Sequence, residues 1–472
     1  MASDGMLMRF TALSHALGAR LVSFADNSAS GFSSVSIDSR NVREGALFAA
    51  LAGTEHDGHR FVEAAFIAGA AAAVVESPKL AEFNLIDTAR KMGKSLIVVD
   101  NTLRALQESA RIYLEQFPRL LKIGITGSSG KTTTKEIAAA IIGAEKNTVM
   151  NPGNFNSETG LPLSVFGVRD FHEAGIFEMG MNRRGEIAEL AAVLKPNIAL
   201  ITNTGSAHIG ILGSKQAIAE EKKRIFSQFT GNEVALIPGG SEFRNFLAEG
   251  VQGTVRFYGP QTIAGLERIT ELGLEGSEIV LGGRRIRFAL PGKHNLADAL
   301  AAVAIAQEIP VSQEAIQRGL EKTPPLFGRG EILRGRTTVI RDCYNANPES
   351  LEQAVEFCNS LEWPGRRIYV IGDMLELGSN SRAAHEDMGR LLLASRADRV
   401  FLYGNETEAA AGILDAALAA GEWSRPFFHT RSMEELSRAL DGDIQGGELV
   451  LLKGSRGCAL EQLSGMLAGE DA

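Results

Sequence analysis

Short apolar runs alternate with amphipathic stretches through the middle of the chain. Residues 120–125 form one apolar run, and residues 131–145 then show the apolar spacing of a helix. Short apolar runs favour buried strands, and strands that alternate with helices pack as parallel sheets with crossover helices. The pattern therefore predicts a central α/β domain with a parallel sheet. Its further expected elements are strands 175–179, 197–202 and 233–238 and helices 186–194 and 215–229.

Two more α/β units are expected, one on each side of this domain. A strand ends near Asn101, and Pro324 with Pro325 interrupts the helical pattern that precedes them. These breaks predict a small N-terminal α/β domain (1–101), a central domain (102–322) and a Rossmann-like C-terminal domain (323–472). The flanking units are expected to contain strands 34–40, 72–76, 337–342, 367–371, 399–403 and 448–453 and helices 62–68, 349–361 and 383–394.

The loop after residues 120–125 carries the strongest chemical signal. Small residues, Thr126-Gly127-Ser128-Ser129-Gly130, lead into Lys131, Thr132 and Thr133 at the expected helix start. Glycines let successive N–H groups converge on an anion, and the helix N-terminus adds positive charge. Lysine then reaches the terminal phosphates, and the Thr132 hydroxyl can bind magnesium. Although Ile125 replaces the first glycine of the strict pattern, the loop predicts a P-loop mononucleotide-binding domain that binds a nucleoside triphosphate.

Composition narrows the class of protein. The 472 residues are 44% hydrophobic and carry a net charge of −9, which argues against a nucleic-acid partner. No apolar run approaches the ~20 residues needed to span a membrane, so membrane insertion is not expected. The three cysteines are too scattered for a disulfide framework or a zinc site. Residues 1–6 lack the regions of a secretory signal, which predicts a cytoplasmic enzyme.

Two candidate ligands follow strands of the expected central sheet. Glu178 ends one strand at a glycine turn, and His208 lies in the loop after the next. Ligands bind at the carboxyl ends of parallel strands, so Glu178 beside a triphosphate is a natural magnesium ligand. Each residue also has a simpler interpretation. Glu178 could face water in a turn, and a lone histidine is usually structural.

Lys222 is predicted to point inward. It lies four residues after Ile218 and three before Ile225, on the apolar face of its helix, whereas Lys223 is rotated by ~100° toward water. Burial lowers the pKa of an amine, and a neutral amine can react with carbon dioxide to give an anionic carbamate that binds metal. The alternative is a lysine that extends along the helix flank to solvent.

Several polar groups near turns could bind substrates or could simply form those turns. Asn295 precedes a helix and could contact a purine ring. Arg329 lies in the linker 323–330, and the Asp342 and Lys453 regions each follow an expected strand. In the first domain, the segments 38–40 and 57–59 could hold a ligand.

Together these motifs resemble the Mur ligases, the ATP-dependent amide-bond-forming enzymes of bacterial cell-wall synthesis, over all three domains. The chain is most similar to the member that joins D-alanyl-D-alanine to UDP-N-acetylmuramoyl-tripeptide through an acyl phosphate. The motifs that carry the resemblance are 125–133, 177–186, 293–295, 344–348, 371–377 and 453–456.

The resemblance implies a role for each site residue. Lys131 and the loop would hold ATP, Thr132 and Glu178 one Mg²⁺, and His208 with a carbamylated Lys222 a second Mg²⁺. Asn295, Arg329 and Asp342 would complete the nucleotide site. The residues expected at the other substrates are Ser39 and Arg40 for the uridine nucleotide, Asn154, Asn156 and Thr159 for the acceptor, and Asn345, Asn347, Lys453, Ser455 and Arg456 for the dipeptide and for domain closure.

Asp298 departs from the family pattern, which usually has asparagine there, so it is left out of the expected nucleotide site. A monomer is expected. Two other functions stay open at this point: a folylpolyglutamate synthase-like ligase, and a P-loop NTPase switch that joins nothing. Diaminopimelate and lysine both remain open as the third residue of the tripeptide.

Overall fold

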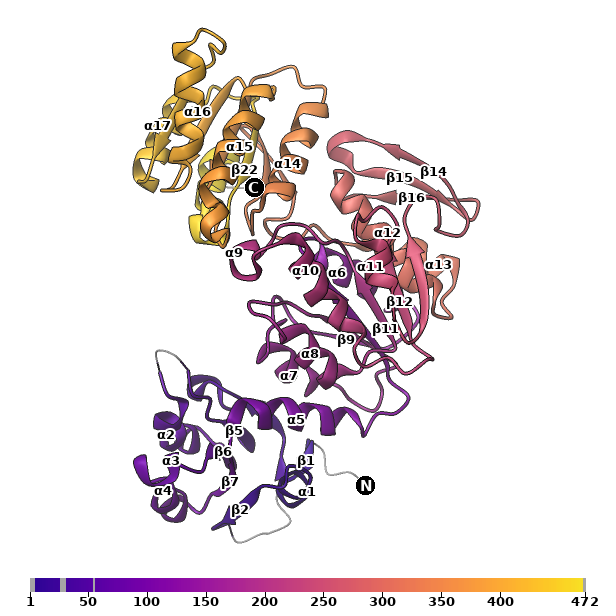
Figure 1. Cartoon of the computed structure of the whole chain (residues 1–472), viewed down its shortest axis with the longest axis vertical. Coiled ribbons are helices and arrows are strands. Elements are labelled where there is room, and N and C mark those ends of the chain that lie inside the picture. Colours follow the sequence, from indigo (N-terminus) through magenta and orange to yellow (C-terminus); the bar gives the residue numbers. More distant parts are fainter. Residues whose placement is uncertain (1–4, 26–30, 54–55, 470–472) are drawn as a thin grey trace.

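The computed structural model describes residues 5–25, 31–53 and 56–469, so the segment 1–6, which bears on the absence of a secretory signal, lies partly outside the described residues. Three α/β units follow one another along the chain and are stacked from one end of the molecule to the other (Figure 1). In the described part of the chain, no helix is long and apolar enough to cross a membrane.

The first unit is built on a five-stranded sheet of order β2-β7-β6-β5-β4, in which only β2 runs antiparallel to its neighbour. Its strands are β2 (Arg20–Ser23), β4 (Ser34–Ser36), β5 (Ala46–Ala49), β6 (Ala72–Glu76) and β7 (Ser95–Val99), its helices α1 (Phe10–Ala16), α2 (Val62–Ile67), α3 (Lys79–Glu82) and α4 (Leu85–Met92), and β1 (Met8–Arg9) pairs with β3 (Gly31–Phe32) beside them.

The central unit has a six-stranded, fully parallel sheet of order β13-β12-β11-β8-β10-β9, which confirms the predicted parallel sheet. The strands are β8 (Leu121–Thr126), β9 (Thr148–Met150), β10 (Ala174–Glu178), β11 (Ile198–Ile201), β12 (Val234–Pro238) and β13 (Thr254–Tyr258). The helices are α5 (Thr102–Leu114), α6 (Lys131–Ile142), α7 (Gly160–Val165), α8 (Glu186–Leu194), α9 (Ile209–Leu212), α10 (Lys215–Lys223), α11 (Arg244–Ala248), α12 (Lys293–Gln307) and α13 (Gln313–Lys322). A small antiparallel sheet of β14 (Leu266–Glu271), β15 (Ser277–Leu281) and β16 (Arg284–Phe288) packs beside α13.

The third unit has a six-stranded sheet of order β17-β18-β22-β19-β20-β21, parallel except for β17. Its strands are β17 (Glu331–Arg334), β18 (Thr338–Asp342), β19 (Arg367–Gly372), β20 (Arg399–Tyr403), β21 (Phe427–Thr430) and β22 (Leu449–Lys453). Its helices are α14 (Pro348–Ser360), α15 (Ser381–Ala394), α16 (Glu408–Ala419), α17 (Met433–Asp443) and α18 (Ser464–Ala468).

Several predicted boundaries were wrong, each for a local reason. The strand expected over 34–40 stops at Ser36, because the Asp38 carboxylate accepts from the Arg40 N–H and starts a 3₁₀ turn. The helix expected over 131–145 ends at Ile142, before Gly143. The helix expected over 215–229 ends at Lys223 and continues as a 3₁₀ turn, Arg224–Phe226. The elements α4, α16, α17 and β21 were not predicted.

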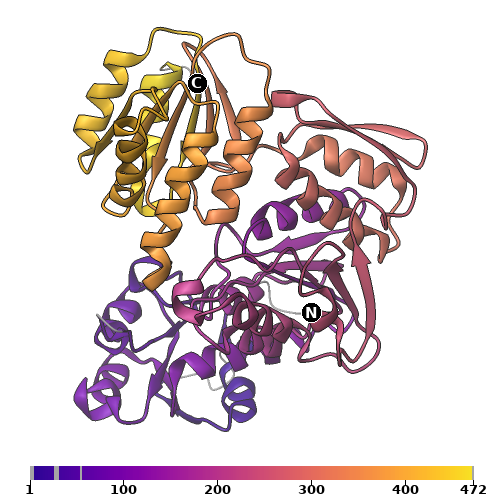
Figure 2. The ribbon, with the colours of Figure 1, turned by 45° about the horizontal axis from the view of Figure 1, so that its top comes forward.

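The first and central units share one continuous cluster of buried apolar side chains, whereas the third unit has clusters of its own. Phe32 of the first unit is buried against Phe166 of the central unit, with ring centroids 6.1 Å apart. The domain boundaries at 101 and 322 remain predictions. Figure 2 shows the third unit, in orange to yellow, beside the central unit, and residues of both units line one cavity.

Candidate active site

The phosphate loop joins β8, the central strand of its sheet, to α6. Gly127 and Gly130 have positive φ angles of 158° and 76°. A Cβ atom would lie 1.7 Å from Thr202 Oγ1 at Gly127 and 2.1 Å from Asp298 Oδ1 at Gly130, so only glycine fits at either position. Lys131 folds back over the loop, and its Nζ donates to the Gly127 carbonyl at 2.8 Å.

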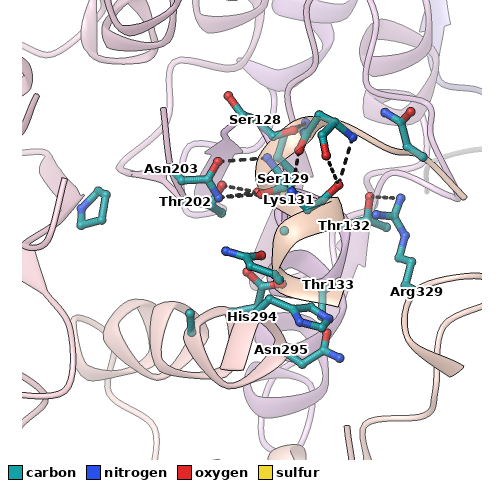
Figure 3. A pocket seen from close by; sticks show the side chains of 18 of the residues that line it. Ser128, Ser129, Lys131, Thr132, Thr133, Thr202, Asn203, His294, Asn295 and Arg329 are labelled. Atoms are coloured by element: carbon teal, nitrogen blue, oxygen red, sulfur yellow. Dashed lines mark hydrogen bonds between the residues drawn. The ribbon is translucent and has the colours of Figure 1, made fainter. Parts of the chain in front are cut away.

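Residues after β11 support the outer side of this loop (Figure 3). The Thr202 hydroxyl and the Asn203 side-chain amide both donate to the Ser129 carbonyl, at 2.6 and 3.1 Å. The Asn203 side-chain oxygen accepts from the Ser129 N–H at 3.1 Å. Neighbouring strands thus hold the loop in the curled form that presents N–H groups to phosphate.

Glu178 and Thr132 are brought together, as the magnesium prediction requires. The Thr132 hydroxyl donates to Glu178 Oε2 at 2.7 Å, and the Asn156 amide donates to Glu178 Oε1 at 2.6 Å. Arg329 Nη2 donates to Thr132 Oγ1 at 3.0 Å (Figure 3). A buried carboxylate beside a hydroxyl forms an oxygen set that fits Mg²⁺. The simpler interpretation of Glu178 as a turn carboxylate in water was wrong.

His208 also lines the cavity, but its ring is engaged by the third domain. His208 Nδ1 lies 2.9 Å from Glu376 Oε2. Among the described residues, no group of three or more His, Cys, Asp or Glu side chains is arranged to hold a metal. A metal ion at this site would therefore also need ligands of other kinds, such as hydroxyl groups, phosphate or a modified lysine.

Lys222 is completely buried, which confirms its predicted inward direction, whereas Lys223 is half-buried. Burial lowers the pKa of Lys222 well below its ordinary value, and the positive charge of Lys131 lowers it further. A lowered pKa favours the neutral form of the amine, which is the form that reacts with carbon dioxide. Lys222 does not reach the cavity surface itself.

One large cavity of about 1110 Å³ runs from the phosphate loop to the third domain. Asn295 lines it, with its side-chain amide donating to the Pro291 carbonyl at 2.8 Å. Asp342 lines the opposite side and pairs with Lys453 Nζ at 2.8 Å. The predicted residues that line the cavity are Ser128, Ser129, Gly130, Lys131, Thr132, Thr133, Asn154, Asn156, Glu178, His208, Asn295, Arg329, Asp342, Asn345, Asn347 and Lys453.

The remaining predicted residues do not line this cavity: Thr126, Gly127, Lys222, Ser39, Arg40, Thr159, Ser455 and Arg456. Thr126 is the last residue of β8, and Gly127 follows it directly. Ser455 is buried and accepts from the Leu375 N–H at 2.9 Å, while Arg456 pairs with Glu461 at 2.6 Å. Arg40 is in the first domain, where it is 86% exposed and pairs with Asp38.

The first-domain segment 57–59 makes hydrogen bonds within its own domain. His59 is buried, with Nδ1 2.6 Å from Asp57 and Nε2 accepting from the Glu76 N–H at 2.9 Å. Both ring nitrogens are thus engaged within the domain, which favours the turn interpretation of this segment.

Sequence reasoning missed Asp298, which was excluded but lies fully enclosed against Gly130 and lines the cavity. Burial raises the pKa of Asp298 well above its ordinary value, although the charge of Arg329 opposes this rise. Its place on α12, three residues after Asn295, was a usable signal. Glu349 and Glu376 were missed because they act across a domain interface that has no local pattern.

Family comparisons agree with this geometry. The model described as "Mur ligase middle domain" matches residues 125–306, "Mur ligase, glutamate ligase domain" matches 328–456, and "Mur ligase family, catalytic domain" matches 32–122. This chain belongs to the Mur ligase family. The resemblance stated from the sequence is confirmed, as is the three-domain Mur ligase architecture.

Individual relatives cover nearly the whole Mur ligase chain. UDP-N-acetylmuramoyl-tripeptide–D-alanyl-D-alanine ligase of Treponema pallidum is 44% identical over 94% of this chain and 95% of its own length. The Bacillus subtilis enzyme of the same name is 34% identical over 91% and 92%. A crystal structure of MurF from Acinetobacter baumannii matches with TM-score 0.85 and 28% identity, covering 97% and 98%. MurF ligase from Thermotoga maritima in complex with ADP matches with TM-score 0.77 and 26% identity, covering 92% and 97%.

Proposed function

We propose that this Mur ligase joins D-alanyl-D-alanine to UDP-N-acetylmuramoyl-tripeptide at the expense of ATP, giving the UDP-muramoyl-pentapeptide, ADP and phosphate for peptidoglycan synthesis. The observation that carries the proposal is the single cavity in which Lys131 and Thr132 of the phosphate loop face Asp342 and Lys453 of the third domain. Relatives that bear this enzyme's name match over more than nine-tenths of the chain. We further propose that it acts as a cytoplasmic monomer.

The chemistry requires activation, because a carboxylate does not react with an amine at neutral pH. A carboxylate oxygen of the tripeptide attacks the γ-phosphorus, and the bond to the β-phosphate oxygen breaks to release ADP. The dipeptide amine then attacks the acyl carbon, loses a proton, and expels phosphate. Lys131 and the loop N–H groups neutralise charge on the transferred phosphoryl group. The third domain excludes water that would hydrolyse the acyl phosphate.

Magnesium fits the oxygen set of Thr132 and Glu178, and bound there it would neutralise phosphate charge. We assign a second ion to His208 and carbamylated Lys222. The complete burial of Lys222 and the lowered pKa of its amine support this assignment.

The other predicted residues have proposed roles in substrate binding. Asn295 and Arg329 would hold the nucleotide with Asp342, while Asn154 and Asn156 would contact the acceptor. Asn345, Asn347 and Lys453 would meet the dipeptide. Ser39 and Arg40 would bind the uridine nucleotide, and Thr159, Ser455 and Arg456 would support these sites from outside the cavity.

A folylpolyglutamate synthase-like activity has weaker support. FolC of Escherichia coli in complex with ADP matches 77% of this chain with 18% identity and TM-score 0.56, which shows a shared fold alone. A P-loop switch that hydrolyses ATP without joining substrates would need no large cavity between the phosphate loop and another domain.

Phosphate release under four conditions separates these functions. We expect ATP turnover only when the UDP-muramoyl tripeptide and D-alanyl-D-alanine are both present, with the pentapeptide detected by mass spectrometry. Equal turnover with neither substrate would contradict the proposal and favour a switch. Varying the third residue between diaminopimelate and lysine then identifies the natural tripeptide.

A further inference from the structure

The loop that carries His208 is held by the third domain at three points. The Glu349 carboxylate, in the first turn of α14, accepts from the Ser206 N–H at 3.0 Å and from the Ser206 hydroxyl at 2.5 Å. Lys215, at the start of α10, lies 3.3 Å from the same carboxylate. Glu349 thus holds one side of the loop through a hydrogen-bonded pair that is mostly sheltered from water.

Glu376 holds the other side, at His208 itself. Both partners have backbones in the left-handed region, with φ of 64° at His208 and 66° at Glu376. Non-glycine residues rarely adopt this conformation unless the surrounding structure imposes it, and such strain gathers at functional sites. Two strained residues on different domains therefore face each other across 2.9 Å.

The third contact is between backbones. A Cβ atom at Gly210 would lie 2.4 Å from the Gly378 backbone nitrogen and 2.6 Å from the Leu377 carbonyl carbon. A Cβ atom at Gly378 would lie 2.8 Å from Gly210 Cα. Glycine on both sides lets the two chains approach closely, so the loop and the third domain have matching shapes as well as matching charges.

The geometry points to Glu376 as a positioning residue that orients His208 from across the domain interface, with Glu349 clamping the same loop. A histidine that binds metal almost always donates its other ring nitrogen to a carboxylate, which fixes the ring and its tautomer. Glu376 lies beside Nδ1, so Nε2 is the ring nitrogen that would bind a cation. This inference rests on the proposed function, because it assigns to third-domain docking the completion of the second cation site.

The ordering of the reaction follows from this arrangement. Thr132 and Glu178 both belong to the central domain, so this pair is present before docking. The His208 site gains its supporting carboxylate only when the third domain, which also brings the dipeptide residues, is in place. ATP can then bind to the open enzyme, whereas phosphoryl transfer waits for docking.

Manganese binding tests this directly, with a non-hydrolysable ATP analogue and electron paramagnetic resonance. In Glu376→Ala we expect the second Mn²⁺ to bind about 10-fold more weakly and the first to be unchanged, while kcat falls 10- to 100-fold with little change in the KM for ATP. Glu376→Gln should recover part of both losses, because its amide oxygen can still lie beside Nδ1. Glu356→Gln, at an exposed position on α14 of the same domain, is the control and should behave like wild type.

Gly210→Ala provides a second test that leaves every charge in place. The added methyl group would separate the two backbones, so we expect the same selective loss of the second Mn²⁺. Gly412→Ala, where the added methyl group meets open space, is its control. Wild-type Mn²⁺ binding and kcat in both Glu376→Ala and Gly210→Ala would overturn the inference, as would equal weakening of both ions.

The two proposals fail separately. If wild-type enzyme forms no pentapeptide but the second Mn²⁺ still depends on Glu376, the proposed function is wrong and the docking inference stands. If pentapeptide forms and Mn²⁺ binding does not depend on Glu376, the proposed function stands and the docking inference is wrong.

Discussion

The central domain meets its two neighbours through different kinds of surface. On the side of the first domain, Phe32, Phe166 and Tyr113 form a buried aromatic contact, with Tyr113 and Phe166 centroids 5.3 Å apart. On the side of the third domain, the contacts are mainly ionic and polar, through Glu349 and Glu376, with half-buried apolar packing from residues such as Ile209.

The difference indicates which interface can open. Separating the aromatic contact would expose apolar surface to water at about 25 cal/mol per Å². Polar groups at the other interface recover hydrogen bonds to water when they separate, so opening costs little. We therefore expect the first and central domains to act as one body and the third domain to dock onto it reversibly.

The largest expected effect lies beneath the polar interface, at Lys222. Lys222→Ala should lower kcat by ~10³-fold, because a metal ligand contributes several kcal/mol to charge stabilisation. Steady-state pentapeptide formation measures this. Lys222→Glu, or short added carboxylates with Lys222→Ala, should restore part of the activity.

Lys223→Ala is the control for this prediction. Lys223 donates to the Phe246 carbonyl at 2.7 Å from the half-buried side of the same helix, and its loss should change kcat little. Full activity in Lys222→Ala would contradict the proposed carbamate at Lys222.

The next largest effect is expected at the aromatic interface, and it concerns the free energy of unfolding rather than catalysis. Phe32→Ala leaves a cavity between two domains and should destabilise their shared core by about 3 kcal/mol. Hydrogen exchange should then rise in both the first and central sheets but not in β18–β22 of the third. Phe171→Ala, at a 63% exposed ring, should have little effect. Faster exchange confined to the first domain would contradict a single body.

Weakening the polar interface should have a moderate effect. The Arg329 guanidinium carbon lies 4.1 Å from the Tyr344 ring centroid, and the side chain donates to Thr132. Arg329 therefore connects the segment between the central and third domains to the phosphate loop. Arg329→Lys keeps the charge but loses the planar stacking, and should raise the KM for ATP about 10-fold. Tyr344→Phe, which keeps the ring, should be near wild type, and a large loss there would show that the hydroxyl matters instead.

The smallest effect is expected at Asp57, which belongs to neither interface. Burial raises the pKa of Asp57, but hydrogen bonds from His59 and Lys79 outweigh it and lower the pKa from 3.8 to about 2. A depressed folded-state pKa gives stability that is full above pH 4 and lost as the pH falls toward 2.

Comparing the acid unfolding of wild type with Asp57→Asn isolates this contribution. We expect a difference of about 1 kcal/mol at pH 7, after discounting for partial exposure, that disappears near pH 2. A difference that is the same at both pH values would assign the effect to packing rather than to charge.

Local patterns predicted the parts of the molecule that local physics decides. The parallel sheet, the phosphate loop and the inward direction of Lys222 follow from hydrophobic spacing and glycine placement, and all three are present. Element ends were harder to predict, because a single side-chain hydrogen bond such as that of Asp38 stops a strand.

The interface residues could not be predicted, because their partners are far away in sequence. Glu376 and His208 are separated by most of two domains, and nothing near either residue signals the other. Asp298 was missed for another reason. Comparison with a family pattern excluded it from the expected site, although its position on α12 places it beside Gly130.

Oxygen transfer tests most directly whether the phosphate loop activates a carboxylate. The tripeptide is labelled with ¹⁸O in its terminal carboxylate, and the phosphate released during pentapeptide formation is analysed by mass spectrometry. An acyl phosphate predicts one ¹⁸O atom in each phosphate, because the carboxylate oxygen that attacks the γ-phosphorus leaves with it. Unlabelled phosphate, formed at the same rate as the pentapeptide, would contradict the account.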